Sequence, residues 1–312
     1  MAASVEALRI ALIGAGRMGR VHLRALAAAP SAAAVAVVDP VASVRNELAT
    51  TGVRVYADVQ ELLAAGGFDA VLVAAPTDLH RDLVATFAEA RVSILCEKPC
   101  GLTAAETRAS TDVVADAGVV LQIGYWRRFV PELVELRERL AAGALGALSL
   151  IQCWQWDEQP PSPAFRSRSG GILIDMGVHE FDQIRWLTGQ EFEQIAVMAS
   201  AVAAGAPVPG DPDTVQAQAR LSGGAIATVS LGRRFPPGDS CWVEVMGTGG
   251  HARSEFMSGP DGDAVFLGAL ISQIEAFAIA ARGGEQRGAT GADAVHAIDA
   301  AERAAAALDG VL

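Results

Sequence analysis

The chain has 312 residues, of which 51% are hydrophobic and 19% charged, and its formal net charge is −12. This composition excludes a disordered chain, the length suits two domains, and the acidic charge argues against nucleic acids and anionic membranes as partners. The 24 basic residues include a single lysine, Lys98. Because arginine keeps its proton at physiological pH, the one retained lysine marks a position for chemistry that a guanidinium cannot perform.

Short apolar runs and helical segments alternate regularly in the first part of the chain. The apolar runs predict strands over 8–13, 34–38, 70–74, 92–95 and 119–122. Helical spacing between them predicts helices over 18–28, 79–90 and 104–115. Strands that alternate with helices are typical of βαβ units, so we predict an α/β fold with a doubly wound parallel sheet over residues 1–124.

Residues 125–312 follow a different pattern and predict a second α/β domain. Its helices are expected over 131–141, 170–187, 267–281 and 292–308, and its strands over 148–157, 194–201, 214–221, 225–235, 242–247 and 251–256. Polar and apolar residues alternate over 214–221, which is typical of an antiparallel sheet with one face in water. No apolar run reaches the roughly 18 residues that a membrane span needs. The four cysteines form no C-x-x-C pair, which favours reduced thiols, a cytoplasmic protein and no metal site.

A glycine-rich loop follows the first predicted strand. Within its sequence, Gly-Ala-Gly-Arg-Met-Gly, Gly14 permits a tight turn, Gly16 lets a pyrophosphate approach, and Gly19 lets helix and strand pack closely. Asp39 ends the second strand, where a ribose-binding carboxylate is expected. The sequence therefore predicts a dinucleotide site, with NAD favoured over NADP because Asp39 would repel a 2′-phosphate. The alternative for Asp39 is a turn residue before Pro40.

Lys98 stands in a Cys-Glu-Lys-Pro segment directly after the predicted strand 92–95. Ligands of doubly wound sheets bind at the carboxyl ends of the strands. Pro99 keeps Lys98 extended and is itself a candidate cis proline. We predict that Lys98 donates a hydrogen bond to a substrate hydroxyl beside a nicotinamide. The alternative is a surface lysine paired with Glu97.

A second candidate catalytic segment is the predicted helix that begins at Gly170. Asp175 and His179 are four residues apart and share a face of this helix, and Asp182 follows near the same stripe. An imidazole held by a carboxylate is suited to accept the proton of an alcohol during hydride transfer. The alternatives are a salt pair on the helix surface and a zinc site whose third ligand the sequence does not place.

These motifs occur in one order with Ala-Pro-Thr at 75–77 and Gly-Tyr-Trp-Arg-Arg-Phe at 124–129. Over nearly the whole chain they resemble the glucose–fructose oxidoreductase/inositol dehydrogenase/rhizopine catabolism (Gfo/Idh/MocA) family, and within it most of all the inositol 2-dehydrogenases. The resemblance implies an N-terminal Rossmann domain and a C-terminal domain with a large open antiparallel sheet. It also implies that copies pair through this sheet as homodimers or homotetramers.

The same resemblance implies roles for individual residues. Lys98, Asp175 and His179 are the expected catalytic residues, with His179 as proton acceptor, and Trp126 and Arg127 are expected to join them around the substrate. The residues expected around the cofactor are Gly14, Gly16, Arg17, Met18, Gly19, Asp39, Pro76, Thr77, His80, Glu97 and Lys98.

The leading hypothesis is an NAD-dependent dehydrogenase that oxidises a secondary hydroxyl of a cyclic polyol or sugar, with a myo-inositol-like substrate. Two features depart from the family pattern, because segment 257–267 is short and segment 267–281 lacks aromatic residues beside Phe277. The alternatives are an aldose or other sugar derivative as substrate, a glycosidase that uses NAD without net oxidation, and an NAD-binding sensor without turnover. Trp154 and Trp156 suit sheet packing or a subunit interface as well as a sugar platform.

Overall fold

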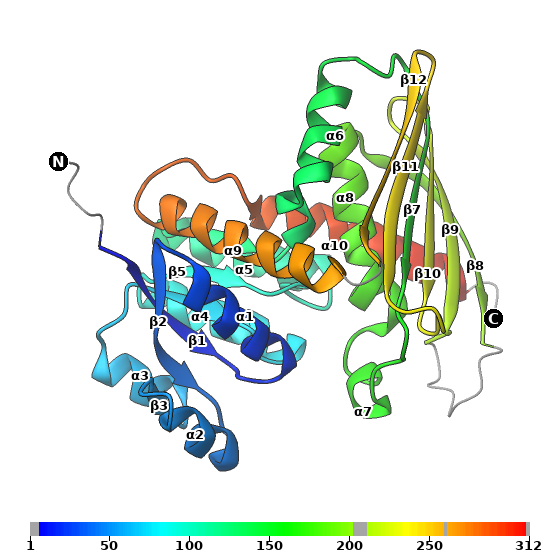
Figure 1. Ribbon diagram of the computed structural model, residues 1–312. Helices are drawn as coiled ribbons and strands as arrows, with labels where there is room; N and C mark the ends of the chain where they lie inside the picture. Colours follow the sequence, from blue (N-terminus) through cyan, green and yellow to red (C-terminus); the bar gives the residue numbers. More distant parts are fainter. Residues whose placement is uncertain (1–5, 202–210, 259–260, 310–312) are drawn as a thin grey trace. The chain divides into compact units, whose positions relative to one another are not determined.

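The computed structural model describes residues 6–201, 211–258 and 261–309, which form two compact units (Figure 1). The first unit contains the chain through Gly101 together with Ala105–Tyr125 and Leu267–Ala292. The second contains Leu102–Ala104, Trp126–Phe266 and the chain from Asp293 on. The boundary expected after residue 124 lies one residue before the crossing between Tyr125 and Trp126, which is one of several crossings between the units. Sequence periodicity does not reveal the return of 267–292 to the first unit, because that return depends on contacts between distant segments.

The first unit is built on a seven-stranded sheet with the order β13-β6-β5-β4-β1-β2-β3. Its strands are β1 (Leu8–Ile13), β2 (Ala32–Val38), β3 (Arg54–Tyr56), β4 (Ala70–Val73), β5 (Ser93–Cys96), β6 (Leu121–Ile123) and β13 (Ala289–Thr290). The pairs from β6 to β3 are parallel, and β13 adds an antiparallel edge. The strand order reverses at β1, which confirms the predicted doubly wound Rossmann sheet and places its ligand-binding switch point beside β1.

Helices cover both faces of this sheet, as the complete burial of β4 requires. They are α1 (Arg17–Ala28), α2 (Ala42–Ala49), α3 (Val59–Ala65), α4 (His80–Glu89), α5 (Ala104–Ala117) and α9 (Gly262–Ala281), with a 3₁₀ turn at Thr77–Leu79. The segments α2, β3 and α3 were not predicted, because each is too short to show a clear period.

Helix α9 corrects the expectation that no segment is long and apolar enough to span a membrane. Its 20 residues meet that criterion by length and composition. However, Ile274 and Phe277 are fully buried, and the carbonyl of Gln273 accepts a hydrogen bond from Gln122 of β6. The helix therefore forms part of the core of the first unit. It begins five residues before the expected position and takes up most of the short segment 257–267, of which residues 259–260 lie outside the described part.

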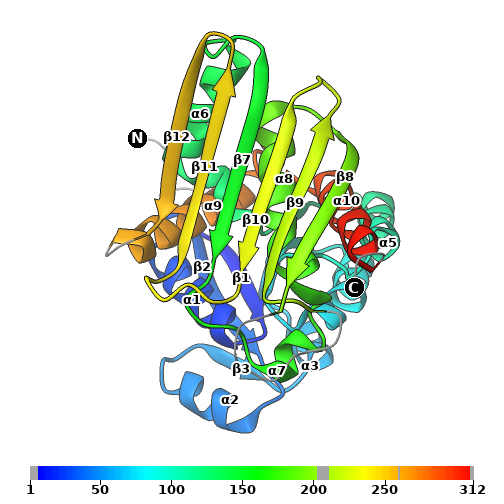
Figure 2. The ribbon, with the colours of Figure 1, turned by 90° about the vertical axis from the view of Figure 1, so that its right-hand side faces the viewer.

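The second unit contains a six-stranded sheet with the order β12-β11-β7-β10-β9-β8 (Figure 2). Its strands are β7 (Leu148–Trp156), β8 (Phe192–Ser200), β9 (Thr214–Leu221), β10 (Ile226–Gly232), β11 (Ser240–Gly247) and β12 (Gly250–Met257). The sheet is open and mostly antiparallel as predicted, but its central pair, β7 and β10, runs parallel. The helices of this unit are α6 (Pro131–Ala141), α7 (Pro163–Arg166), α8 (Val178–Thr188) and α10 (Gly291–Asp309), with a 3₁₀ turn at Trp126–Phe129 and a π turn at Leu173–Gly177.

Within the described part of the second unit, one face of the sheet carries no helix (Figure 2). Alternation along β9 buries Val215, Ala217 and Ala219 on the helix side and leaves polar residues on the other. On this open face, Trp154 stacks on both Trp156 and Trp242, with ring centroids 4.9 and 5.6 Å apart. The stacking confirms that Trp154 and Trp156 lie on the same side of the sheet.

Candidate active site

The glycine loop has the geometry that its three glycines predict. Gly14 has a φ of +91°, and a side-chain carbon added to it would lie 2.9 Å from the backbone oxygen of Ala74. A carbon added to Gly19 would lie only 2.1 Å from the backbone oxygen of Gly14, so helix α1 packs directly on the loop. Beside Gly16, by contrast, no atom of the described residues outside its own stretch of chain lies within 4 Å of such a carbon. This open space at the N-terminus of α1 suits a pyrophosphate, and Arg17 and Met18 begin the helix beside it.

Asp39 connects the glycine loop to the end of β2. Its carboxylate accepts hydrogen bonds from the backbone N–H of Ala15, at 2.9 Å, and of Val41, at 2.8 Å. The second contact is the turn role that the sequence left as an alternative. Asp39 therefore stabilises the loop and its own turn, at the strand end where a ribose-binding carboxylate is expected.

His80 is buried beneath the cofactor loops. Its Nδ1 lies 2.7 Å from the carbonyl oxygen of Pro99 and its Nε2 lies 2.8 Å from that of Ala75. Burial lowers the pKa of His80, and the hydrogen bonds to the carbonyls of Pro99 and Ala75 act in the opposite direction. The side chain is only 1% exposed, and it therefore supports the loop that presents Pro76 and Thr77 rather than meeting a ligand itself.

Glu97 holds the strand end that presents Lys98. One carboxylate oxygen lies 2.6 Å from Nε2 of His22, which is fully buried on α1, and the other accepts the backbone N–H of Lys98 at 3.2 Å. Burial raises the pKa of Glu97, but the hydrogen bond and charge of His22, together with the charge of Lys98, hold it below its ordinary value. The Lys98–Pro99 peptide bond is cis, as anticipated from the sequence. The half-buried Lys98 lies two residues after the end of β5, at the carboxyl edge of the sheet.

In the second unit, Asp175 and His179 lie on a helix that is not regular. Gly170 and Gly171 both have positive φ angles, of +80° and +83°, and a side-chain carbon on Gly170 would clash with Ile174. The chain then forms the π turn Leu173–Gly177, which contains Asp175, before α8 begins with Val178 and His179. The prediction of one continuous α-helix over 170–187 was therefore wrong at its start. Single π turns are frequent at functional sites.

Aromatic side chains pack beside His179. The ring of Trp126 meets that of His179 edge to face at a centroid distance of 6.4 Å, and Phe266 packs on Trp126 at 4.8 Å. Trp126 and His179 are 7% exposed each, and Asp175 is 9% exposed. Trp126 and His179, which the sequence places 53 residues apart, are therefore neighbours in the second unit.

Arg127 differs from its expected role. It is only 3% exposed, and its guanidinium donates to Glu180 at 2.6 Å and to Gln155 at 2.7 Å. The sequence does not reveal this pairing, because Glu180 lies 53 residues away. Arg127 is thus a buried structural cation within the second unit, and direct contact with a substrate has no support in its environment.

Asp182 also differs from expectation. It pairs with Arg128, whose Nε donates to it at 3.0 Å, and both side chains are buried. The stripe of carboxylates expected around His179 is therefore divided. Asp175 lies in the π turn, whereas Asp182 belongs to a separate ion pair.

The structure adds residues to the environment of Asp175 that sequence reasoning missed. Arg233 donates a hydrogen bond to the Asp175 carboxylate at 3.3 Å, and Asp157 interacts electrostatically with both residues. Arg233 and Asp157 directly follow strands β10 and β7. Their placement at strand ends is a signal that could have identified them.

We expect Asp157→Asn to stabilise the protein at pH 7.5. Burial, and then the charges of Asp239 and Asp175, raise the pKa of Asp157 to about 6. Between the ordinary pKa near 4 and this value, only the folded state keeps the proton, so stability falls as the pH rises and the full cost of about 2–3 kcal/mol applies above pH 6. Thermal unfolding should show the gain at pH 7.5 and its loss near pH 4. An equal gain from Asp112→Asn, on the exposed surface of α5, would contradict this cause.

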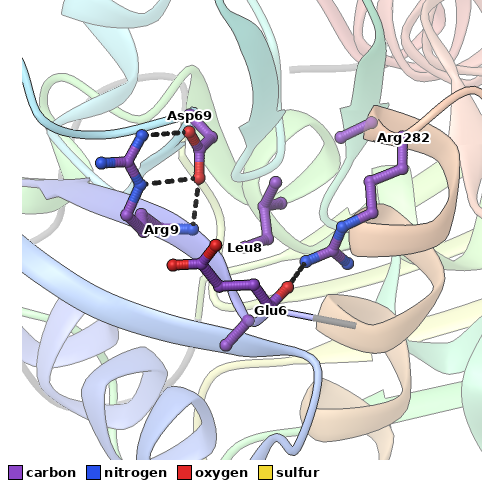
Figure 3. Close-up of a pocket in the computed structure, with 7 residues that line it drawn as sticks. Glu6, Leu8, Arg9, Asp69 and Arg282 are labelled. Carbon is purple, nitrogen blue, oxygen red and sulfur yellow. Dashed lines mark hydrogen bonds and ion pairs between the residues drawn. The ribbon is translucent and has the colours of Figure 1, made fainter. Parts of the chain in front are cut away.

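A cavity of about 530 Å³ lies at the other end of β1 from the glycine loop (Figure 3). Three of its charged side chains are already engaged, because Arg9 pairs with Asp69 and Arg282 donates to the backbone carbonyl of Glu6. Ligands of this fold bind at the opposite strand ends, so this cavity is not the candidate site. Among the described residues, no group of three or more His, Cys, Asp and Glu side chains is arranged to hold a metal ion.

Comparison with known proteins identifies relatives over both units. Residues 8–125 match the model of an oxidoreductase family with an NAD-binding Rossmann fold, and residues 133–253 match the GFO/IDH/MocA C-terminal domain. The chain is 53% identical to the rhizopine catabolism protein MocA of Rhizobium meliloti, over 95% of this chain and 93% of that protein. It is 34% identical to inositol 2-dehydrogenase of the same species (strain 1021), over 80% of this chain and 76% of that protein.

A solved structure agrees with both the fold and these relatives. The crystal structure of a myo-inositol dehydrogenase from Corynebacterium glutamicum matches with a TM-score of 0.88 and 25% identity. The match covers 98% of this chain and 97% of that one. The two-unit architecture is therefore that of known dehydrogenases.

Proposed function

Because the chain belongs to the GFO/IDH/MocA family of NAD-binding oxidoreductases, we propose that it oxidises a secondary hydroxyl of a cyclic polyol or sugar to a ketone. The observation that carries this proposal is the segment with Asp175 and His179. It carries a carboxylate and an imidazole four residues apart, and the imidazole packs on the ring of Trp126. We propose a myo-inositol-like substrate, as the names of the inositol dehydrogenase relatives suggest.

In the proposed reaction each unit has its own task. The glycine loop and Asp39 bind NAD, which supplies the hydride acceptor when bound. Lys98 donates a hydrogen bond to the reacting hydroxyl and polarises it. His179 accepts the proton of the reacting hydroxyl while the hydride leaves the carbon that bears this hydroxyl. Asp175 orients the hydroxyl groups of the substrate. One alcohol and one NAD thus give one ketone, one NADH and one proton.

A substrate screen tests this proposal. The protein is incubated with NAD and a panel of inositols and aldoses, and NADH absorbance and released sugar are both measured. NADH formation with an inositol supports the proposal. NADH formation with aldoses alone moves the substrate class to sugars. Release of sugar from glycosides without NADH would indicate the non-redox alternative, and no turnover with any compound would indicate an NAD-binding sensor.

The cofactor preference follows from Asp39. We expect NAD to be used in preference to NADP, because the carboxylate would lie close to a 2′-phosphate and repel it. A repulsion of about 1.4 kcal/mol gives a tenfold preference in kcat/KM. Asp39→Ser should reduce this preference, and Asp58→Ser, which alters the cap of helix α3, is the control. Equal use of both cofactors by the unaltered protein would contradict this expectation.

We also propose that copies of the chain associate through the open face of the second sheet. In addition to the stacked tryptophans, this face carries Ile226 at 53% and Met198 at 74% exposure. Exposed apolar side chains that share a face with aromatic residues are typical of subunit interfaces.

The association can be tested by introducing charge on this face. We expect the double variant Met198→Glu/Ile226→Glu to shift a homodimer or homotetramer to monomers in light scattering, because carboxylates would be buried against apolar side chains. The matched control is Leu79→Glu, which adds a charge at an exposed leucine of the first unit. An unchanged mass of the double variant would place the interface elsewhere.

We infer a cytoplasmic location from the four cysteines. Cys96, Cys100, Cys153 and Cys241 are buried free thiols. Free thiols are favoured in a reducing compartment, where NAD-linked polyol metabolism also takes place.

A further inference from the structure

We propose that Arg233 is a positioning residue for Asp175, and that it acts through a bridge to Asp211. This inference rests on the proposed function, because it concerns how the carboxylate of that site is held. Arg233 follows the carboxyl end of β10, and none of its surface is exposed.

The guanidinium of Arg233 is divided between two carboxylates. Its Nη1 donates to Asp175 and its Nη2 donates to Asp211, each at 3.3 Å. The backbone N–H of Arg233 donates to the carbonyl of Asp213 at 2.9 Å, which fixes the start of the side chain. A planar fork of donors can join two carboxylates in this way, whereas the single ammonium of a lysine serves as one point charge.

Asp211 is the fixed end of this bridge. Arg166 donates from Nε to the Asp211 carboxylate at 2.6 Å and from Nη2 to the Asp211 carbonyl at 2.7 Å. The backbone N–H of Ile172 donates to the same carboxylate at 2.7 Å. Ile172 directly precedes the π turn, so Asp211 is bonded both to the start of this turn and, through Arg233, to Asp175 in its middle.

The bridge compensates for an irregular backbone. The π turn replaces the regular helical hydrogen bonds that would otherwise set the direction of the Asp175 side chain. Buried ion pairs contribute little net stability compared with apolar side chains of similar volume, but removing one partner leaves a costly unpaired charge. Placing Arg233 between two buried carboxylates is therefore better explained by the position it gives to Asp175 than by stability alone.

A double-mutant cycle on the full-length protein tests this role. The variants are Arg233→Met, Asp175→Asn and the double variant, assayed with NAD and myo-inositol, or with the aldose that the substrate screen identifies. Arg233→Lys and Asp211→Asn provide milder forms of the same change if Arg233→Met does not fold. Arg185→Met is the matched control, because Arg185 pairs with Glu191 elsewhere in the second unit. Kd for NADH, KM, kcat and the melting temperature are measured for each variant.

We expect Arg233→Met to lower kcat/KM by about tenfold or more, Arg233→Lys to recover part of this loss, and the NADH Kd to change by less than about twofold. In the Asp175→Asn background, Arg233→Met should lower kcat/KM by less than about a third of the factor by which it lowers kcat/KM in the unaltered protein. The reason is that the group positioned by Arg233 is already changed.

If the double variant loses kcat/KM by the product of the factors of the two single variants, the proposal is overturned, because Arg233 then acts independently of Asp175. Normal kcat/KM in folded Arg233→Lys and Asp211→Asn would also overturn it, while leaving the proposed function intact. Absence of turnover by the unaltered protein would overturn the proposed function itself.

Discussion

Lys98→Met should lower kcat for polyol oxidation by about a hundredfold or more, the usual contribution of a group that assists proton transfer. Lys98 follows β5 at the carboxyl edge of the first sheet, and the His22–Glu97 pair fixes the backbone on which it stands. The methionine keeps an unbranched side chain that is one atom shorter, but it removes the charge and the donors. Steady-state kinetics and NADH titration measure the effect, and the NADH Kd should stay within about twofold, because the glycine loop is untouched.

The sharper substitution is Lys98→Arg, which keeps the charge. If Lys98 is retained only as a positive charge, arginine should work nearly as well. If a compact ammonium must donate to a hydroxyl, the planar guanidinium should fit poorly and the loss should approach that of methionine. Arg54→Met, which removes a cation from the first unit at β3, is the control and should leave kcat unchanged. Normal kcat in Lys98→Arg would contradict a specific role for the ammonium.

The composition of the chain offers a second test of the same residue. Because Lys98 is the only lysine, reductive methylation modifies it and the N-terminal amine alone. Dimethylation keeps the positive charge but removes two of the three donors. We expect activity to fall in parallel with modification of Lys98. Adding NAD and polyol together should slow both the modification and the loss of activity. Full activity after complete modification would show that the donors of Lys98 are dispensable.

The sequence predicted those features of the site that depend on local chemistry. The conformation of Gly14 and the close packing of Gly19 follow from the absence of a side chain, so their motif identified them. Asp39 was placed at a strand end because it directly follows the second apolar run. In contrast, the partners of buried arginines were not predictable, because Arg127 meets Glu180 from 53 residues away and Arg233 meets Asp175 from 58.

The same limit explains the errors in the fold. The period of a helix shows which face is apolar, but it does not show which sheet that face packs on. Helix α9 was therefore placed in the second domain, although most of it belongs to the first unit. A period of 3.6 also cannot distinguish an α-helix from one interrupted by a single π turn, so the irregularity at Asp175 was missed.

His179→Asn should reduce kcat by a factor of about 10²–10⁴, because it removes the proposed proton acceptor while keeping a polar group of similar size. The surroundings argue against a mainly structural effect. His179 packs edge to face on Trp126, and an asparagine at this position keeps a polar side chain and introduces no charge. The melting temperature and the NADH Kd should therefore change little. His296→Asn, at an exposed histidine of α10, is the matched control.

The decisive measurement is chemical rescue of His179→Gly by added imidazole, which should restore part of kcat in proportion to the concentration of neutral imidazole. A His179→Asn variant with normal kcat would assign proton transfer to another group, and Asp157, whose raised pKa of about 6 also suits a base, would be the next residue to test.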